Sequence, residues 1–261
     1  MTHLPQPQTP RGTLALVGAG PGASDLLTLR AVRRLQQADT VFYDRLVDPD
    51  VLELTSPAAR RVFVGKHVGA HAWPQEKINR VMVAEVLKGR RVVRLKSGDP
   101  GIFGRAGEEL AAARAAGIDA EIVPGITAAC AAAAQTGIPL TERGVSDTLV
   151  LTTAQCKAGD PLPDCARHAK PGTTIVFYMS AGQASRVRGA LLRLGMAPLT
   201  QVIIAVDVSK PGARTVHCDI GTIPDAISRH AITGCATIII TWPKTSLEQT
   251  KTAMKVGQMA L

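Results

Sequence analysis

The first half of the chain alternates short apolar runs with stretches whose apolar residues recur at helical spacing. Strands are predicted at residues 14–17, 40–43, 61–64, 91–95 and 120–123. Between the third and fourth of these, Ile78, Met82 and Val86 recur every four residues, which indicates one buried helical face. Strands that alternate with helices are joined by crossovers, so the pattern predicts a mostly parallel α/β sheet.

The break at Pro124-Gly125 separates this half from a second α/β lobe. Further strands are predicted at 148–152, 173–178, 202–206, 214–218 and 236–241, and helices at 183–194 and 223–229. We therefore expect two α/β lobes with the active site in the cleft between them. The expected layout is a disordered arm at 1–12, an N-terminal α/β domain at 13–123, a C-terminal α/β domain at 124–245 and a tail at 246–261.

The chain carries a formal net charge of +9 at pH 7. Nucleic acid, an acidic membrane surface, a multiply anionic small molecule or plain solubility would each account for it. Aromatic residues make up 3% of the sequence, so stacking platforms for bases are scarce and no nucleic-acid partner is expected. The alanine-rich run at 128–134 is too short to span a membrane, so no membrane partner is expected either.

Five cysteines, an odd number without a Cys-x-x-Cys pair, indicate free thiols in a reducing compartment. No metal site is predicted from them. Residues 1–10 have no apolar signal core, so a cytoplasmic location is expected.

A constrained loop follows the strand predicted at 91–95. Asp99 precedes Pro100, which disfavours helical geometry at Asp99, and Gly98 lets the backbone approach a ligand closely. Open α/β sheets bind ligands at the carboxyl ends of their strands, so residues 97–105 are predicted to hold one.

A second glycine motif follows the first predicted strand. Gly18-x-Gly20-x-x-Ala23, with Asp39 and Asp44 about twenty residues on, matches the dinucleotide fingerprint and leaves an NAD-dependent dehydrogenase as an alternative. However, Pro21 has no N–H to give to a pyrophosphate. A tight turn between strand and helix explains the same residues.

Several longer motifs occur in a fixed order along the chain. They are VGAGPG at 17–22, LLTLR at 26–30, YDRLV at 43–47, VGK at 64–66, PQEKIN at 74–79, GDP at 98–100, FGRAGEE at 103–109, VPGITAA at 123–129 and GIPLT at 137–141. Together they resemble the tetrapyrrole methylases over residues 13 to 245, densely up to residue 141 and more loosely beyond it. The chain departs from the family pattern at Ser97, Ser180 and Val208, where the family often has glycine.

The resemblance implies a homodimer of two-domain chains with an anionic tetrapyrrole as substrate. The implied reaction transfers methyl groups from S-adenosyl-L-methionine to C-2 and C-7 of uroporphyrinogen III. Its products are precorrin-2 and S-adenosyl-L-homocysteine, in the porphyrin pathways that lead to siroheme and cobalamin. Two alternatives stay open: a methylase of another corrin precursor, and a diverged protein that binds cofactor or tetrapyrrole without turnover.

Two residues match catalytic positions of the family pattern, and three arginines are candidates for substrate binding. Asp44 matches the proton acceptor, although a turn aspartate would look the same in sequence. Lys66 matches the proton donor, with a solvated lysine as its alternative. Arg45, Arg105 and Arg143 lie in motif loops and are expected to bind substrate carboxylates, unless they form salt bridges.

The cofactor-binding positions follow from the same resemblance. Asp99 is expected to bind the amino-acid moiety of the cofactor or to lie near its sulfonium. Met179 rests on the resemblance alone, since a methionine is more often core filler. The matching residues are Pro21, Ser97, Gly98, Asp99, Ile102, Thr127, Ala128, Met179 and Val208.

Overall fold

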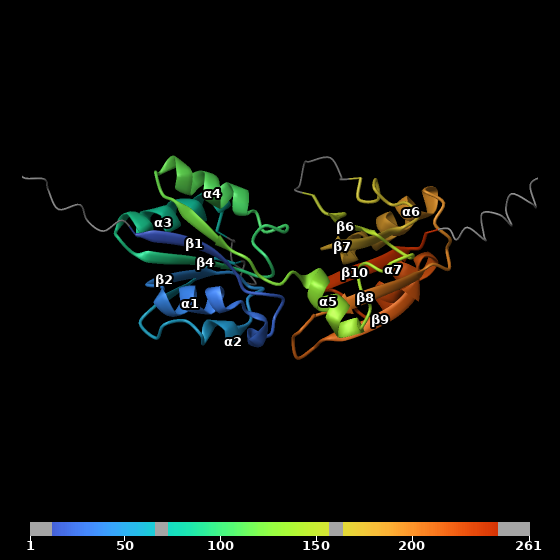
Figure 1. Ribbon diagram of the computed structural model, residues 1–261, viewed down its shortest axis with the longest axis horizontal. Helices are drawn as coiled ribbons and strands as arrows, with labels where there is room; N and C mark the ends of the chain where they lie inside the picture. Colours follow the sequence, from blue (N-terminus) through green and yellow to red (C-terminus); the bar gives the residue numbers. More distant parts are fainter. Residues whose placement is uncertain (1–11, 66–72, 157–163, 245–261) are drawn as a thin grey trace, which may run out of the picture. The chain divides into compact units, whose positions relative to one another are not determined.

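The computed structural model describes residues 12–65, 73–156 and 164–244. The chain divides into two compact units, residues 1–128 and 129–261 (Figure 1). The predicted tail and all but the last residue of the predicted arm lie outside the described residues. The domain boundaries predicted from the sequence, and the cleft predicted between the lobes, stay predictions.

The described part of the first unit is built on a five-stranded sheet in the order β3-β2-β4-β1-β5. Each neighbouring pair in this sheet is parallel, which confirms the predicted parallel sheet. All five strands therefore end at the same edge of the sheet. The strands are β1 (Thr13–Gly18), β2 (Thr40–Tyr43), β3 (Arg60–Phe63), β4 (Arg91–Lys96) and β5 (Ala120–Val123).

Helices cover both faces of this sheet, with α3 and α4 on one face and α1 and α2 on the other (Figure 1). Side chains alternate along a strand, so Val92 packs in the cluster under α3 while Val93 packs in the cluster under α1. Thr28 begins α1 by accepting a hydrogen bond from the backbone N–H of Ala31. The helices are α1 (Leu29–Gln37), α2 (Pro49–Leu52), α3 (Gln75–Leu87) and α4 (Ala106–Ala115).

The described part of the second unit contains a mixed five-stranded sheet in the order β6-β7-β10-β8-β9. Only β6 and β7 pair in parallel, and β10 runs antiparallel between β7 and β8. The strands are β6 (Thr148–Thr153), β7 (Thr173–Tyr178), β8 (Gln201–Val206), β9 (Arg214–Asp219) and β10 (Ala236–Trp242).

Helices α6 (Ala184–Arg193) and α7 (Ile223–Arg229) pack with the apolar face of this sheet, which includes Ile175 and Phe177. Helix α5 (Ala128–Thr136) is joined to the sheet by hydrogen bonds at both of its ends. The hydroxyl of Tyr178 accepts from the backbone N–H of Ala129, and the Gln135 amide donates to the hydroxyl of Thr215.

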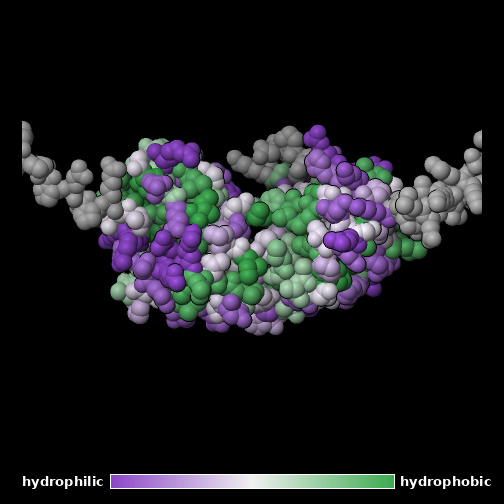
Figure 2. All heavy atoms as spheres, viewed as in Figure 1, coloured by the Kyte–Doolittle hydropathy of each residue, from purple (hydrophilic) through white to green (hydrophobic). Residues whose placement is uncertain are grey.

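Apolar side chains lie among polar ones on the surface of each unit (Figure 2), with Leu29 and Leu199 among the more exposed. No helix in the described part of the chain is long and apolar enough to cross a membrane.

Candidate functional site

The two glycine motifs form one structure at the carboxyl edge of the first sheet. The backbone N–H of Gly20 donates to the carbonyl of Gly98 at 3.2 Å, and the N–H of Gly98 donates back to the carbonyl of Gly20 at 2.6 Å. The N–H of Ala19 also donates to the carbonyl of Lys96 at 2.7 Å. The turn after β1 is thus bonded along its length to the loop after β4.

A third loop, after β5, packs against the other two through glycines. A Cβ built at Gly18 would lie 2.6 Å from the Cα of Gly125, and one built at Gly125 would lie 2.8 Å from the Cα of Gly18. Such distances are too short for any side chain, so these positions need glycine. Gly98 adopts a φ of +70°, which glycine adopts without strain. We call these three loops, at residues 18–22, 97–105 and 124–127, the glycine cradle.

Asp99 fastens the glycine cradle together. Its Oδ1 accepts a hydrogen bond from the N–H of Gly101 at 2.7 Å, and its Oδ2 accepts from the N–H of Gly125 at 3.0 Å. The first bond shapes the loop after β4, and the second ties that loop to the one after β5. Each oxygen of a carboxylate has a second lone pair. The contact with the cofactor predicted for Asp99 stays a prediction, beside this observed structural part.

The remaining cofactor-binding residues predicted in the first unit also lie at this edge. Pro21 is buried in the turn after β1, and Ser97 and Ile102 are half-buried in the loop after β4. Thr127 and Ala128 are half-buried where the loop after β5 leads into α5. The structure therefore brings together seven of the nine predicted positions, which come from three separate motifs.

The other two predicted cofactor-binding positions lie in the second unit. Met179 follows β7 with a φ of 53° and is 53% exposed, so it does not fill the core. Val208 follows β8 and is buried between Asp207 and Ser209, which have φ values of 48° and 54°. A positive φ is uncommon outside glycine, and such strained positions cluster at functional sites.

Ser180, which stands where the family often has glycine, has a structural part in this unit. It is fully buried, and its hydroxyl donates to the carbonyl of Tyr178 at 2.8 Å. The same hydroxyl accepts from the N–H of Ala154 at 2.9 Å. The serine thus joins the end of β7 to the residue that follows β6.

Asp44 follows β2 at the carboxyl edge of the first sheet and is 29% exposed. Its Oδ1 accepts a hydrogen bond from the N–H of Leu46 at 3.1 Å, which is the turn contact that the sequence left open. Its Oδ2 lies 3.3 Å from Nη2 of Arg94, which donates to it. The Asp44 carboxylate is partly open to solvent, so it can still accept a proton while it keeps the turn contact.

Arg94 belongs to a buried group of charges beneath Asp44. Glu109 is fully buried on α4, and it accepts from Nε of Arg94 at 3.0 Å and from Nζ of Lys96 at 2.7 Å. The Gln75 amide on α3 also donates to Glu109, at 3.3 Å. Burial lowers the pKa of Lys96 and the charge of Arg94 lowers it further, while Glu109 acts in the opposite direction. We call Asp44, Arg94, Glu109 and Lys96 the buried charge network.

The sequence analysis did not single out Arg94, Lys96 or Glu109, although a signal was present. Arg94 and Lys96 follow Val92 at alternate positions of a buried strand, so their side chains lie on the face covered by α3 and α4. Buried cations need a carboxylate partner. The second glutamate of the FGRAGEE motif supplies it, and that pairing depends on the tertiary fold.

The predicted catalytic and substrate-binding residues have different surroundings. Lys66 lies outside the described residues. Arg45 is exposed next to Asp44, and Arg143 is exposed in a turn of the second unit. Arg105 forms two hydrogen bonds with Glu108, at 2.7 and 2.8 Å, on the exposed start of α4. That pair is the salt bridge that the sequence left open for Arg105.

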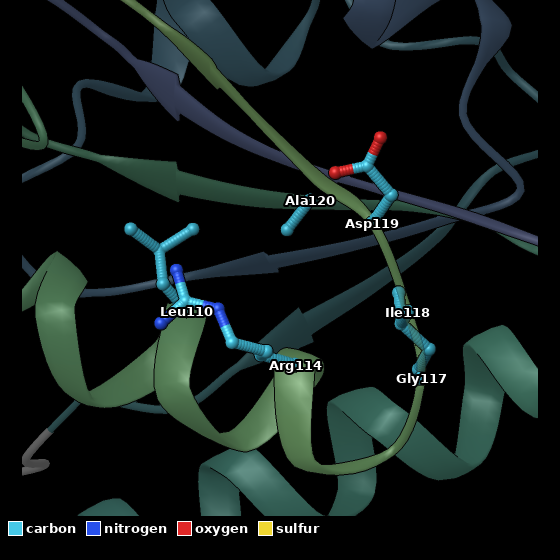
Figure 3. Close-up of a pocket in the computed structure, with 6 residues that line it drawn as sticks. All are labelled: Leu110, Arg114, Gly117, Ile118, Asp119 and Ala120. Atoms are coloured by element: carbon cyan, nitrogen blue, oxygen red, sulfur yellow. The ribbon is translucent and has the colours of Figure 1, made fainter.

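A surface pocket of about 300 Å³ lies away from the glycine cradle (Figure 3). It is formed by the end of α4 and the start of β5, at the edge of the sheet where the strands begin. Arg114 extends toward Leu110 there, whereas the carboxylate of Asp119 points away (Figure 3). Within the described residues, no group of three or more His, Cys, Asp or Glu side chains is placed to hold a metal ion.

The sequence and the fold of this chain are similar to those of known protein families and solved structures. A family model described as tetrapyrrole (corrin/porphyrin) methylases matches residues 13–224. A uroporphyrin-III C-methyltransferase from Thermus thermophilus, solved with S-adenosyl homocysteine, is 37% identical with a TM-score of 0.75 and covers 88% of this chain and 97% of its own. A cobalt precorrin-4 methyltransferase is 30% identical with a TM-score of 0.79, over 90% of this chain and 97% of its own.

Curated relatives have a higher sequence identity to this chain, but the matched region is a smaller share of their own length. A siroheme synthase of Psychrobacter sp. is 44% identical over 219 residues, which are 84% of this chain and 44% of the relative. Siroheme synthase 2 of Klebsiella pneumoniae is 51% identical over 194 residues, which are 74% of this chain and 42% of the relative. The chain thus spans less than half the length of these relatives.

Proposed function

The chain belongs to the tetrapyrrole (corrin/porphyrin) methylases, and from that premise we propose that it methylates uroporphyrinogen III at C-2 and C-7 to give precorrin-2. It is a methyltransferase that uses S-adenosylmethionine, and the proposal adds the tetrapyrrole and the two carbons. The observation that carries it is the 37% identity with a uroporphyrin-III C-methyltransferase over 88% of this chain.

The glycine cradle fits the cofactor. A Cβ built at Gly98 would meet only the Cα of Thr127, at 4.0 Å, so the backbone of Gly98 has no side chain over it at the carboxyl edge of the sheet. Parallel sheets bind ligands at this edge. Bound S-adenosylmethionine supplies an electrophilic methyl group on a sulfonium. We expect Pro21, Ser97, Ile102 and the residues around them in the cradle to position it. The cofactor contacts predicted from the sequence for Met179 and Val208 stay predictions.

Asp44 is the proposed proton acceptor, because the ring that gains a methyl group must lose a proton. Its carboxylate is held by Leu46 and Arg94 and keeps part of its surface exposed. Lys66 is the proposed proton donor.

The substrate would be bound through its eight carboxylates. The net charge of +9 favours a multiply anionic ligand, and the exposed guanidinium groups of Arg45 and Arg143 can bind carboxylates with two hydrogen bonds each. Arg105 would have to exchange its hydrogen bonds with Glu108 for a substrate carboxylate. We further propose a homodimer, which light scattering of the purified chain would test directly.

Incubation with S-adenosylmethionine and enzymatically made uroporphyrinogen III tests the proposal. We expect products that are heavier by one and then two methyl groups in mass spectrometry. Absence of both products overturns the reaction. Parallel incubation with other corrin precursors tests the second candidate, which the TM-score of 0.79 with the cobalt precorrin-4 methyltransferase favours. Calorimetric binding of S-adenosylhomocysteine without turnover of any precursor would identify a protein that binds without catalysis.

A further inference from the structure

The buried charge network runs from the carboxyl edge of the first sheet into its interior. Asp44 lies at its exposed end, and Glu109, fully buried, lies at its inner end. Arg94 is the link, because its guanidinium contacts both carboxylates, at 3.3 Å from Asp44 and 3.0 Å from Glu109. The side chain of Arg94 is 5% exposed, so solvent does not compete for these contacts.

The guanidinium of Arg94 has one available orientation in this setting. Its Nε is bonded to Glu109, and its Nη1 donates to the carbonyl of Leu95 at 2.8 Å. The guanidinium is planar and its donors form a rigid fork. Once those two contacts are made, the direction of Nη2 is determined, and Nη2 points at Asp44.

The carboxylate of Asp44 is therefore held at both oxygens. The N–H of Leu46 donates to Oδ1, and Arg94 donates to Oδ2. The first contact is local to the turn, whereas the second comes from a strand that is fixed in the sheet. Without Arg94, the carboxylate would be free to turn about its χ angles while keeping the local contact.

We propose that Arg94, itself held by Glu109, is a positioning residue that fixes the orientation of the Asp44 carboxylate for methyl transfer. This inference rests on the proposed function, because it needs Asp44 to be the proton acceptor. Catalytic groups lose activity when they are misplaced by about 1 Å, so a support of this kind has a measurable effect on rate. A network with only a structural part would instead affect folding.

The test compares Arg94→Gln with Arg91→Gln. Arg91 lies on the same strand, and its Nη2 is 2.7 Å from Oδ1 of Asp39, directly before β2. Both substitutions thus break an ion pair between β4 and an aspartate that flanks β2. We expect Arg94→Gln to lower kcat about tenfold or more with little change in KM, because the interaction acts in the transition state. The control variant should keep its kcat within about twofold.

A double-mutant cycle separates positioning from a structural effect. If Arg94 acts through Asp44, then Asp44→Asn combined with Arg94→Gln is no slower than Asp44→Asn alone in single-turnover measurements. Effects that multiply would overturn the inference, since they would show that the two residues act independently.

Circular dichroism and calorimetric titration with S-adenosylhomocysteine check that each variant folds and binds. If Arg94→Gln does not fold, Arg94→Lys replaces it as the test variant. Its ammonium keeps the positive charge beside Glu109 but lacks the rigid fork of guanidinium donors that reaches Asp44. A lower kcat in Arg94→Lys supports the inference, and full activity overturns it. Wild-type protein without turnover overturns the proposed function and this inference together. A wild type that turns over, with Arg94→Gln behaving like Arg91→Gln, overturns this inference alone.

Discussion

The carboxylate of Asp99 accepts a hydrogen bond at 3.0 Å from the backbone N–H of Gly125, which lies 26 residues further along the chain. Two loops of the glycine cradle are joined by this bond. Asp99→Ala removes it together with the bond to Gly101, so we expect a loss of about 1–3 kcal/mol in unfolding free energy. Binding of S-adenosylhomocysteine, measured by calorimetry, should weaken as well. Asp48→Ala, which removes only a local cap on α2, should leave that binding unchanged.

Replacing Gly125 with alanine should damage the same cradle by adding atoms. The new methyl group would lie 2.8 Å from the Cα of Gly18, so the loops must move apart at a cost of about 1–3 kcal/mol. Gly107→Ala is the matched control, because a Cβ built there meets no atom of the described residues within 4 Å. Since alanine favours a helix interior, this control should be slightly more stable than wild type. Equal melting temperatures for the two variants would contradict the close packing.

Lys96 should make stability rise with pH in alkaline solution. Burial lowers the pKa of Lys96, Arg94 adds to the effect and Glu109 opposes it. The unfolded chain therefore binds more protons at this residue than the folded protein does. The contribution of Lys96 to the unfolding free energy thus rises as pH approaches the ordinary lysine pKa of about 10.4. In urea denaturation, the unfolding free energy of wild type minus that of Lys96→Met should increase as pH rises toward about 10.4. A decrease in this quantity would mean that the pKa of Lys96 is raised instead.

Glu85 should support stability at neutral pH and lose that effect in acid. Burial alone would raise the pKa of Glu85, but Lys88, Arg60 and Arg90 outweigh it and lower the pKa. A lowered carboxyl pKa stabilises the fold above the unfolded value, about 4.3, and the effect disappears as pH falls through the lowered pKa. Glu85→Gln should therefore reduce Tm at neutral pH, and its Tm should approach that of wild type as pH falls below about 4.3.

The control for Glu85 is Glu53→Gln. Glu53 is mostly exposed and pairs with Arg61 at 2.8 Å, so its loss should lower the neutral-pH Tm less. If the Tm of Glu85→Gln stays below that of wild type by the same amount as pH falls well below about 4.3, the pKa of Glu85 is not lowered in the folded protein.

Much of the first unit could be predicted because its signals are local. The structure places β2 and β5 at the residues expected, 40–43 and 120–123, and α4 ends before Gly117, whose φ is +68°. The place of β10 between β7 and β8 could not be predicted, because strand pairing across the chain leaves no periodic signal in any one segment.

The candidate site shows the same division. The sequence placed Asp99 in a ligand loop at a strand end, since Gly98 and Pro100 act on their immediate neighbours. It did not reveal that this loop is bonded to the turn at Gly20, nor that Arg94 lies against Asp44. Both contacts join segments that meet only in the folded sheet.

The glycine cradle has a practical consequence for anyone who maps this site by mutagenesis. Alanine scanning asks what is lost when a side chain is deleted, and at Gly18, Gly98 and Gly125 there is no side chain to delete. A scan that skips glycines would pass over the residues that shape this surface. Here the informative experiment is the addition of a single methyl group.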